Sequence, residues 1–218
     1  MPDWKKDASL RKNAVRFIEA AYDIIDAEGL NSLSVRKVAE RAGFHNSTIY
    51  TYFKDIDALE QLACIRYLAP YASKLSEINS EQLSAGETFY RVWEAYFTEA
   101  FRNPQIFYLL FFGKYDTGIA DAMNTYYDLF PQETHNWSEV VSHMYFGESY
   151  DVRCKNLLKP LAGSHTVRFA ADQVDAVNTL IVNYTKGMLE KKCASPSTDN
   201  EALTRECLSM LHYIVDRT

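Results

Sequence analysis

The sequence predicts an all-α protein. Gly (8) and Pro (6) are scarce among the 218 residues, alternating β-branched runs are absent, and apolar residues recur at helical spacing almost throughout. The hydrophobic content of 47% suits a protein with a packed core. A chain of this length has room for one large domain or two small ones.

Composition also bounds the function. A net charge of −6 argues against nucleic-acid binding unless basic residues gather locally. No cysteine lies in a C-x-x-C pair and the histidines complete no metal-ligand spacing, so we expect reduced thiols, no metal and no cofactor. The N-terminus lacks the apolar region of a signal peptide and no apolar run reaches 18 residues. We therefore expect a cytoplasmic protein without a membrane span.

The first quarter of the chain contains four helical patterns. A helix over 9–28 carries the apolar stripe Val15, Ile18, Tyr22 and Ile25, and Gly29 caps its end. Ser34 is a suitable N-cap for a second helix that runs to residue 41 and ends at Gly43. A third short helix spans about 46–53, with Ile49 and Phe53 directed to the core, and Asp55 caps a fourth.

The rest of the chain continues the helical pattern after a break expected at Pro70. Helices are predicted over 87–102, 104–112 and 118–130, with one or two more between 131 and 163, and two long ones over 171–192 and 201–217. We expect a helix-turn-helix domain over 1–56, a connecting helix over 57–74, and a C-terminal helical domain over 75–218.

Two short helices joined at Gly43, with the small Ala39 at their crossing, have the sequence form of a helix-turn-helix. On the second of these helices the outward side chains are short and polar, which suits contact with base edges in a groove about 12 Å wide. The negative net charge does not exclude DNA binding, because basic residues gather in the first quarter of the chain. They are Lys5, Lys6, Arg11, Lys12, Arg36, Lys37, Arg41 and Lys54.

The stretch SVRKVAERAGFHNSTIYTYFKDIDALEQL resembles the helix-turn-helix of TetR-family transcriptional regulators, and the resemblance covers about 8–62. It implies an N-terminal DNA-binding domain and a larger C-terminal domain that binds a small ligand and forms a homodimer through the last two helices. It also implies two groups of DNA-binding residues. Those expected to hold phosphates are Ser34, Thr48, Tyr52 and Lys54, and those expected to face the groove are Arg36, His45, Asn46, Ser47, Tyr50 and Thr51.

The recognition segment departs from the family pattern at four positions. Many members have a small polar cap where this chain has His45, Lys where it has Asn46, Gly where it has Ser47, and Lys where it has Ile56. Fewer cations in this segment imply a smaller salt-dependent contribution to DNA affinity, or one moved to the N-terminal basic residues.

Aromatic side chains are dense between Phe89 and Trp137. Most would enter the core, but the resemblance implies a cavity, and the candidates for lining it are Trp93, Tyr96, Phe111, Tyr126 and Trp137. His135 and His143 could meet a polar group of a ligand or be ordinary surface or core residues. The sequence has no nucleophile–base arrangement and no glycine-rich phosphate loop, so we expect no catalytic residues and no enzyme.

The last two predicted helices carry heptad-like apolar seams. These could pack against another copy of the chain, or simply be buried in the subunit's own core. The residues predicted at the dimer interface are Val174, Val177, Ile181, Tyr184, Met188, Leu203, Cys207, Met210 and Ile214.

The leading hypothesis is a homodimeric repressor. It would bind a pseudo-palindromic double-stranded DNA operator and be released by a small, largely apolar or aromatic effector. The alternative is a helical interaction protein of the same fold that binds a protein partner instead of DNA. A third option, a carrier or enzyme using only the aromatic domain, leaves the helix-turn-helix without a purpose.

Overall fold

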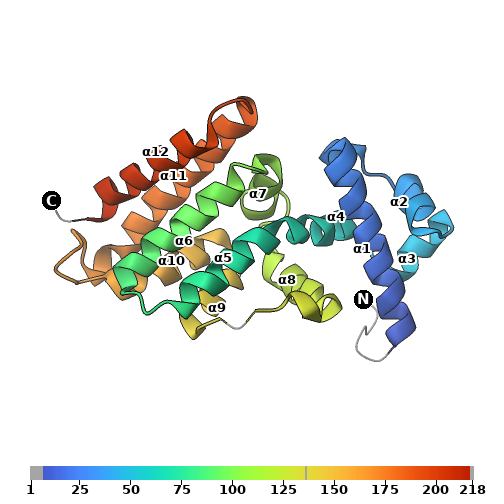
Figure 1. Cartoon of the computed structure of the whole chain (residues 1–218), viewed down its shortest axis with the longest axis horizontal. Coiled ribbons are helices and arrows are strands. Elements are labelled where there is room, and N and C mark those ends of the chain that lie inside the picture. The colour runs from blue at the N-terminus through green and yellow to red at the C-terminus, as the bar shows by residue number, and fades with distance from the viewer. Residues whose placement is uncertain (1–6, 136, 217–218) are drawn as a thin grey trace. The chain divides into compact units, whose positions relative to one another are not determined.

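The computed structural model describes residues 7–135 and 137–216 and confirms the all-α fold class (Figure 1). Within the described residues the sole β-type pairing is an isolated bridge between Val167 and Asp216, and no helix has the length and apolarity needed to cross a membrane. Lys5, Lys6 and Arg217, which entered the predictions above, lie outside the described residues.

The chain forms two compact units. Unit 1 comprises the chain up to Ala69 together with Asp121–Thr134, and unit 2 comprises Pro70–Ala120 and the chain from His135 onward. The helices of unit 1 are α1 (Ala8–Glu28), α2 (Val35–Ala42), α3 (Ile49–Tyr52), α4 (Ile56–Ile65) and α8 (Ile119–Leu129), with 3-10 turns η1 (Leu30–Ser32), η2 (Asn46–Thr48), η3 (Arg66–Leu68) and η4 (Pro131–Glu133).

Helix α1 is the centre of unit 1 and packs against α2, α3 and α4. Its buried face differs from the stripe that the spacing predicts. Phe17 and Ile24 are buried, whereas Val15 and Tyr22 are only half-buried. The reason is aromatic packing, because Phe17 stacks on Phe44 at 4.8 Å between ring centroids and contacts the rings of the third-helix segment. These aromatics come from elements that the α1 sequence alone does not reveal.

The segment Asp121–Thr134 belongs to unit 1, whereas the expected boundaries place it in the C-terminal domain. Arg11 of α1 donates two hydrogen bonds to the carbonyl oxygen of Leu129, at 3.0 and 3.3 Å. The ring of Tyr126 stacks on Phe130 at 4.6 Å, and its hydroxyl donates to Glu133 at 2.6 Å. Contacts between residues more than 100 positions apart therefore place this segment, and no local pattern reports them.

The chain breaks its helix near Pro70, as predicted. Helix α4 ends at Ile65, η3 follows, and α5 (Ala69–Ser80) carries Pro70 in its first turn, where a missing N–H costs no helical hydrogen bond. The other elements of unit 2 are α6 (Ala85–Ala100), α7 (Pro104–Phe111), α9 (Glu139–Tyr145), α10 (Tyr150–Leu158), η5 (Lys159–Leu161), η6 (Ala171–Gln173), α11 (Val174–Ala194) and α12 (Asn200–Val215).

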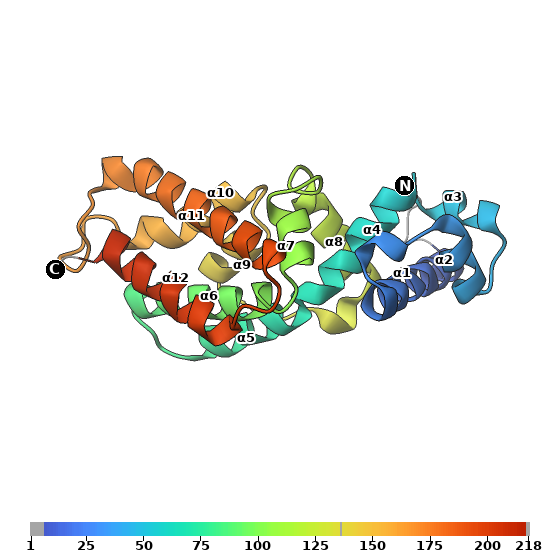
Figure 2. The ribbon, with the colours of Figure 1, turned by 90° about the horizontal axis from the view of Figure 1, so that it is seen from above.

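Unit 2 is a bundle in which the last two helices are neighbours, α12 packs on α6, and α11 packs on α7 and α10 (Figures 1 and 2). Serine caps begin several of these helices. Ser84 and Glu87 form a capping box at the start of α6, where the Glu87 carboxylate accepts from the Ser84 N–H at 2.8 Å. Local sequence therefore fixes where α6 begins, and that helix carries two of the predicted ligand residues.

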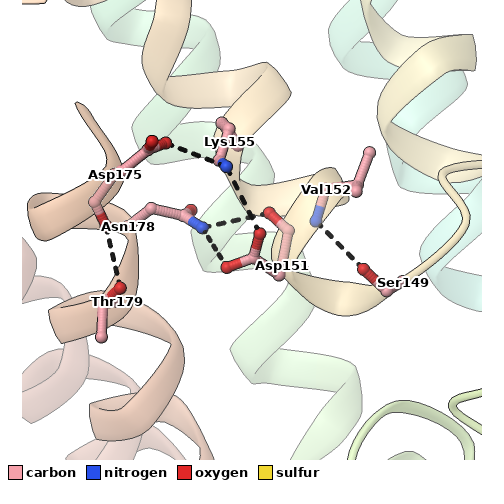
Figure 3. Close-up of polar contacts among 7 residues, drawn as sticks. All are labelled: Ser149, Asp151, Val152, Lys155, Asp175, Asn178 and Thr179. Carbon is pink, nitrogen blue, oxygen red and sulfur yellow. Dashed lines mark hydrogen bonds and ion pairs between the residues drawn. The ribbon is translucent and has the colours of Figure 1, made fainter. Parts of the chain in front are cut away.

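A polar network fixes α10 against α11 (Figure 3). The fully buried Asn178 donates to the carbonyl oxygen of Asp151 at 3.1 Å and to its carboxylate at 2.7 Å. Lys155 forms ion pairs with Asp175 at 2.9 Å and Asp151 at 3.6 Å (Figure 3). These bonds set the orientation of α10, whose other face lines the cavity described below.

Candidate functional site

The turn between α2 and α3 is held by contacts from α1. Gly43 has a φ of +75°, a left-handed conformation that glycine adopts without strain. Arg16 donates to the carbonyl oxygen of Ala42 at 2.6 Å and lies 4.7 Å from the centroid of the Phe44 ring. A Cβ at position 43 would meet the Arg16 guanidinium at 3.1 Å, so both backbone and space favour glycine there.

His45 caps the recognition segment. Its Nδ1 accepts from the Ser47 N–H at 3.4 Å and lies 2.9 Å from the Ser47 hydroxyl. The first turn is the 3-10 turn η2, and α-helical geometry begins only at Ile49, so the predicted third helix is shorter and tighter than its spacing suggested.

Most of the predicted DNA-contacting side chains share an exposed surface of the helix-turn-helix. Tyr50 is 59% exposed, while Ile49 and Phe53 are buried beneath it. The exposed members of the predicted set are Ser34, Arg36, His45, Asn46, Ser47, Tyr50, Thr51 and Lys54, and Thr48 is half-buried. We call these nine residues the recognition face.

Tyr52 lies apart from the recognition face, although the sequence predicted a phosphate contact. Its side chain is buried, its ring lies 5.5 Å from that of Phe17, and its hydroxyl accepts from Asn13 at 2.9 Å. The short α3 turns this ring under the helix toward α1. In this geometry Tyr52 anchors the recognition segment to unit 1.

The cationic side chains on and beside the recognition face differ in whether they are already paired with a carboxylate. Ser34 caps α2 by accepting from the Lys37 N–H at 3.3 Å, and the exposed amide groups of this first turn suit an anion. Lys37 pairs with Glu28 at 2.6 Å, and this partner lowers the pKa of the Glu28 carboxyl. Arg36 and Lys54 form no ion pair with any residue that the structure describes, so both are available to a phosphate.

Unit 2 contains a small cavity lined by residues of α5, α6, α7, α9 and α10. Its volume is about 20 Å³, close to the space of one water molecule. Lining residues are Tyr71, Val92, Trp93, Tyr96, Phe111, Met144, Tyr150, Arg153, Cys154 and Leu157. Burial raises the pKa of the Cys154 thiol, so this cysteine is a neutral wall residue rather than a reactive thiolate.

The structure brings three of the five predicted ligand residues to this cavity: Trp93, Tyr96 and Phe111. Tyr126 lies in unit 1 instead, because the segment that carries it packs on α1. Trp137 lies outside the lining and packs on Tyr145 at 4.5 Å.

The two candidate histidines also lie outside the lining. His135 stacks on Trp137 at 5.4 Å, and His143 is exposed and accepts through its carbonyl oxygen from Asn156 at 3.2 Å.

Sequence reasoning missed the contribution of α10 to the cavity. Tyr150, Arg153, Cys154 and Leu157 all line it, and Arg153 is only 4% exposed. The signal was present, since these positions follow helical spacing i, i+3, i+4 and i+7 with an arginine inside an otherwise apolar stripe. A charged residue at such a position is buried with its stripe and needs a specific environment.

The seam predicted as the dimer interface packs mostly within the subunit. Six of its residues are buried in unit 2: Val174, Val177, Ile181, Met188, Leu203 and Cys207. Tyr184 and Ile214 are half-buried, and only Met210 is exposed. The heptad-like spacing thus reflects packing of α11 and α12 on their own subunit. The large apolar side chains these helices expose are Leu180, Met210 and Tyr213.

Comparison with known proteins agrees with this geometry. Residues 17–61 match the family model described as bacterial regulatory proteins, tetR family, and this range contains the whole recognition face. Proteins of this family are DNA-binding regulators, not enzymes. Among the described residues, no group of three His, Cys, Asp or Glu side chains could hold a metal ion. No curated protein sequence matches the chain.

Solved structures share the fold at low sequence identity. SmeT, the repressor of the Stenotrophomonas maltophilia multidrug efflux pump SmeDEF, aligns with a TM-score of 0.55 and 13% identity over 94% of this chain and 90% of its own. A TetR-family regulator from Streptomyces coelicolor gives 0.53 and 18% over 94% and 96%. FadR from Bacillus subtilis, solved with stearoyl-CoA, gives 0.51 and 16% over 90% and 96%.

Proposed function

Because residues 17–61 match the model of the tetR family of bacterial regulatory proteins, we propose that the chain is a ligand-responsive transcriptional repressor of the cytoplasm. As a homodimer it binds a pseudo-palindromic operator, with one recognition face in each of two successive major grooves. An effector in unit 2 favours a conformation with lower operator affinity, and so releases the DNA.

The observation that carries this proposal is the composition of the recognition face. His45, Asn46, Ser47, Tyr50 and Thr51 project donors and acceptors into solvent from a segment whose apolar side chains are all inside. An ordinary solvated helix carries longer charged side chains. Short polar groups on a rigid support suit hydrogen bonds to base edges, and Arg36, Lys54 and the α2 amides suit the phosphates on either side.

Two facts support control by a ligand. SmeT has been solved with triclosan and the Bacillus subtilis FadR with stearoyl-CoA, both ligands with large apolar parts. In this chain the backbone passes between the two units after Ala69, after Ala120 and after Thr134. We infer that a rearrangement around the cavity is passed to α1 through these connections, since Leu129 accepts its hydrogen bonds from Arg11.

For the homodimer we propose the outward side of α11 and α12. Leu180 is 59% exposed and Tyr213 70% exposed, and exposed large apolar groups favour burial by a partner. Gly187 lies two helical turns beyond Leu180, and nothing lies within 4 Å of a Cβ added there. Glycine inside an exposed helix costs stability, and close approach of a second copy would account for it.

Selection of bound duplexes from a random DNA pool tests the function. The purified chain is expected to enrich a two-fold symmetric sequence whose half-sites are about one helical turn apart. Failure of a folded dimer to enrich any duplex, even after unfolding and refolding to remove a bound ligand, would contradict the proposal. That result would favour the protein-partner alternative.

Sedimentation of single variants tests the interface. Leu180→Glu is expected to yield a monomer because it places a charge at the centre of the proposed contact. Val140→Glu, at an exposed valine of α9, serves as the matched control and should sediment as wild type does. Equal sedimentation of both variants would move the interface elsewhere.

A further inference from the structure

The cavity of unit 2 shares one lining residue, Leu157, with a surface groove. Leu157 lines the 20 Å³ cavity and also a groove of about 300 Å³ between α5, α6, α9 and α10. The groove presents apolar side chains such as Ile78, Phe89 and Val140, and its volume is in the range of small-molecule sites. A rotation of Leu157 would join the two spaces into one site with an apolar outer part.

The inner space holds buried hydrogen-bonding atoms that lack hydrogen bonds of good geometry. These are the indole Nε1 of Trp93 and the hydroxyls of Tyr96 and Tyr150, which interact with each other, and each side chain is at most 5% exposed. Buried polar atoms in native proteins are almost always bonded, so each such atom calls for an explanation. Trp offers only a donor, and a tyrosine hydroxyl can always donate. Donors on three side chains that line one cavity favour a ligand oxygen.

A buried cation accompanies these donors. Arg153 donates to the carbonyl oxygen of Tyr145, and its guanidinium lies 5.3 Å from the centroid of the Phe111 ring. Burial raises the pKa of Tyr71 and Tyr96, and the charge of Arg153 offsets part of that rise in both. The guanidinium therefore acts on the same phenols that line the cavity.

The chain makes room for this arginine. A Cβ at Gly147 would lie 2.8 Å from Cγ of Arg153 and 3.3 Å from its backbone nitrogen, although Gly147 needs no positive φ. A side chain at position 147 would thus displace Arg153. The buried position of Arg153 therefore depends on the absence of a side chain at Gly147.

From these observations we propose that the effector is an apolar monocarboxylic acid. Its carboxylate enters the inner cavity and accepts from Arg153, Tyr96, Tyr150 and Trp93, while its hydrocarbon or aryl body occupies the groove past Leu157. This inference rests on the proposed function, because it names the chemical class of the effector for the same unit.

Other occupants fit less well. An amine would meet the charge of Arg153. A purely apolar molecule would leave the three donors without acceptors, at a cost in affinity. A single water fits the present volume, and this occupant becomes one outcome of the test. A carboxylate matches both the charge and the donors, and charge-assisted hydrogen bonds are the strong ones.

The test uses matched pairs of probes on the full chain: octanoate against 1-octanol, and 4-phenylbutyrate against 4-phenylbutanol. Calorimetric titration measures each affinity, and thermal unfolding measures each stabilisation. At least one acid is expected to bind about tenfold or more tightly than its alcohol. Equal affinities within both pairs, or binding of no acid at all, would overturn the proposal and leave water as the occupant.

Variants assign the binding to the cavity. Arg153→Met is expected to weaken the acid about tenfold or more and to leave the alcohol unchanged, whereas Arg168→Met, at an exposed arginine outside the cavity, should change neither. Tyr150→Phe removes one donor with little change in shape and should weaken the acid severalfold, which covers the case of a misfolded Arg153 variant. Leu157→Ala opens the wall and should tighten binding. Acid affinity unchanged by all three cavity variants would overturn the assignment.

The outcome is separable from that of the proposed function. If the chain selects an operator but no acid binds, only the effector class is wrong. If an acid binds through Arg153 but no duplex is selected, the effector site stands and the function as a DNA-binding repressor fails.

Discussion

The recognition face of unit 1 and the inner cavity of unit 2 use similar chemical groups in opposite surroundings. On the recognition face, the hydroxyls of Ser47, Tyr50 and Thr51 project into water. In the cavity, the hydroxyls of Tyr96 and Tyr150 are buried and form no hydrogen bond of good geometry. Water satisfies the exposed hydroxyls in the absence of DNA, so they cost the folded protein little free energy. The buried hydroxyls have no water to bond and destabilise the ligand-free subunit.

The two sites differ in how much of the chain is needed to build them. The recognition face is built within one short segment, so its residues follow from local caps and helical spacing. The cavity gathers side chains from five helices, and its buried cation is intelligible only after α9 and α10 have been placed beside it. Variants at exposed and at buried positions test this difference.

The largest expected effect concerns the support beneath the recognition face. Phe17→Ala removes a fully buried ring that contacts Phe44 and Phe53, and should lower the free energy of unfolding by about 3–5 kcal/mol. Val15→Ala, at the half-buried position favoured by spacing alone, should cost less than about 1.5 kcal/mol. Urea denaturation measures both. Similar losses would show that the aromatic cluster is not the core of unit 1.

The next effect distinguishes the cations beside the recognition face. Arg36→Ala should weaken operator binding by about 1–3 kcal/mol, with little change in stability. Lys37→Ala should have a smaller effect because Lys37 is already paired with Glu28. Fluorescence anisotropy with a labelled operator measures both affinities. A larger loss for Lys37→Ala would reverse the assignment of the phosphate contacts.

The buried hydroxyls give an effect of opposite sign. Tyr150→Phe should raise the free energy of unfolding of the ligand-free protein by up to about 1 kcal/mol, because it removes a buried polar atom that forms no hydrogen bond of good geometry. Tyr71→Phe, whose hydroxyl donates to the Met144 sulfur at 3.6 Å, is the control and should not stabilise. Tyr50→Phe at the surface should leave stability unchanged. Destabilisation by Tyr150→Phe would show that its hydroxyl is bonded after all.

The smallest effect is a pH dependence at the start of α6. Hydrogen bonds from Ser84 lower the pKa of Glu87. A carboxyl with a lowered folded-state pKa stabilises above its unfolded pKa, about 4.3 for Glu, and loses that contribution as the pH falls through the folded value. Glu87→Gln should therefore be slightly less stable than wild type at pH 7, and the two should converge under acid. A constant difference across this range would contradict the capping role.

More of the structure of unit 1 than of unit 2 could be predicted from the sequence. The caps Ser34 and Asp55, the turn at Gly43 and the break at Pro70 are all present where local chemistry put them. The resemblance implied a phosphate contact for Tyr52, but the short α3, preceded by a 3-10 turn, buries this side chain. Boundaries near Gly and Pro are local properties, but the rotation of a short helix is set by what it packs on.

The unit 2 predictions failed where contacts are distant in sequence. Tyr126 was expected at the cavity, yet a bond from Arg11 to Leu129 and the stack with Phe130 hold its segment in unit 1. Ile181 and Cys207 were expected at a dimer interface, yet they are buried in their own subunit. Periodicity identifies an apolar face, but it does not say whether the same subunit or a partner covers it.

The central claim is that the recognition face reads DNA sequence, and one measurement tests it most directly. Anisotropy titrations would compare wild type and Tyr50→Ala on the selected duplex and on a shuffled duplex of equal composition. Wild type should prefer the selected duplex by roughly 10³-fold or more, and Tyr50→Ala should lose about 1–3 kcal/mol on that duplex alone. Equal binding of both duplexes by folded wild type, or an unchanged preference in Tyr50→Ala, would contradict the claim.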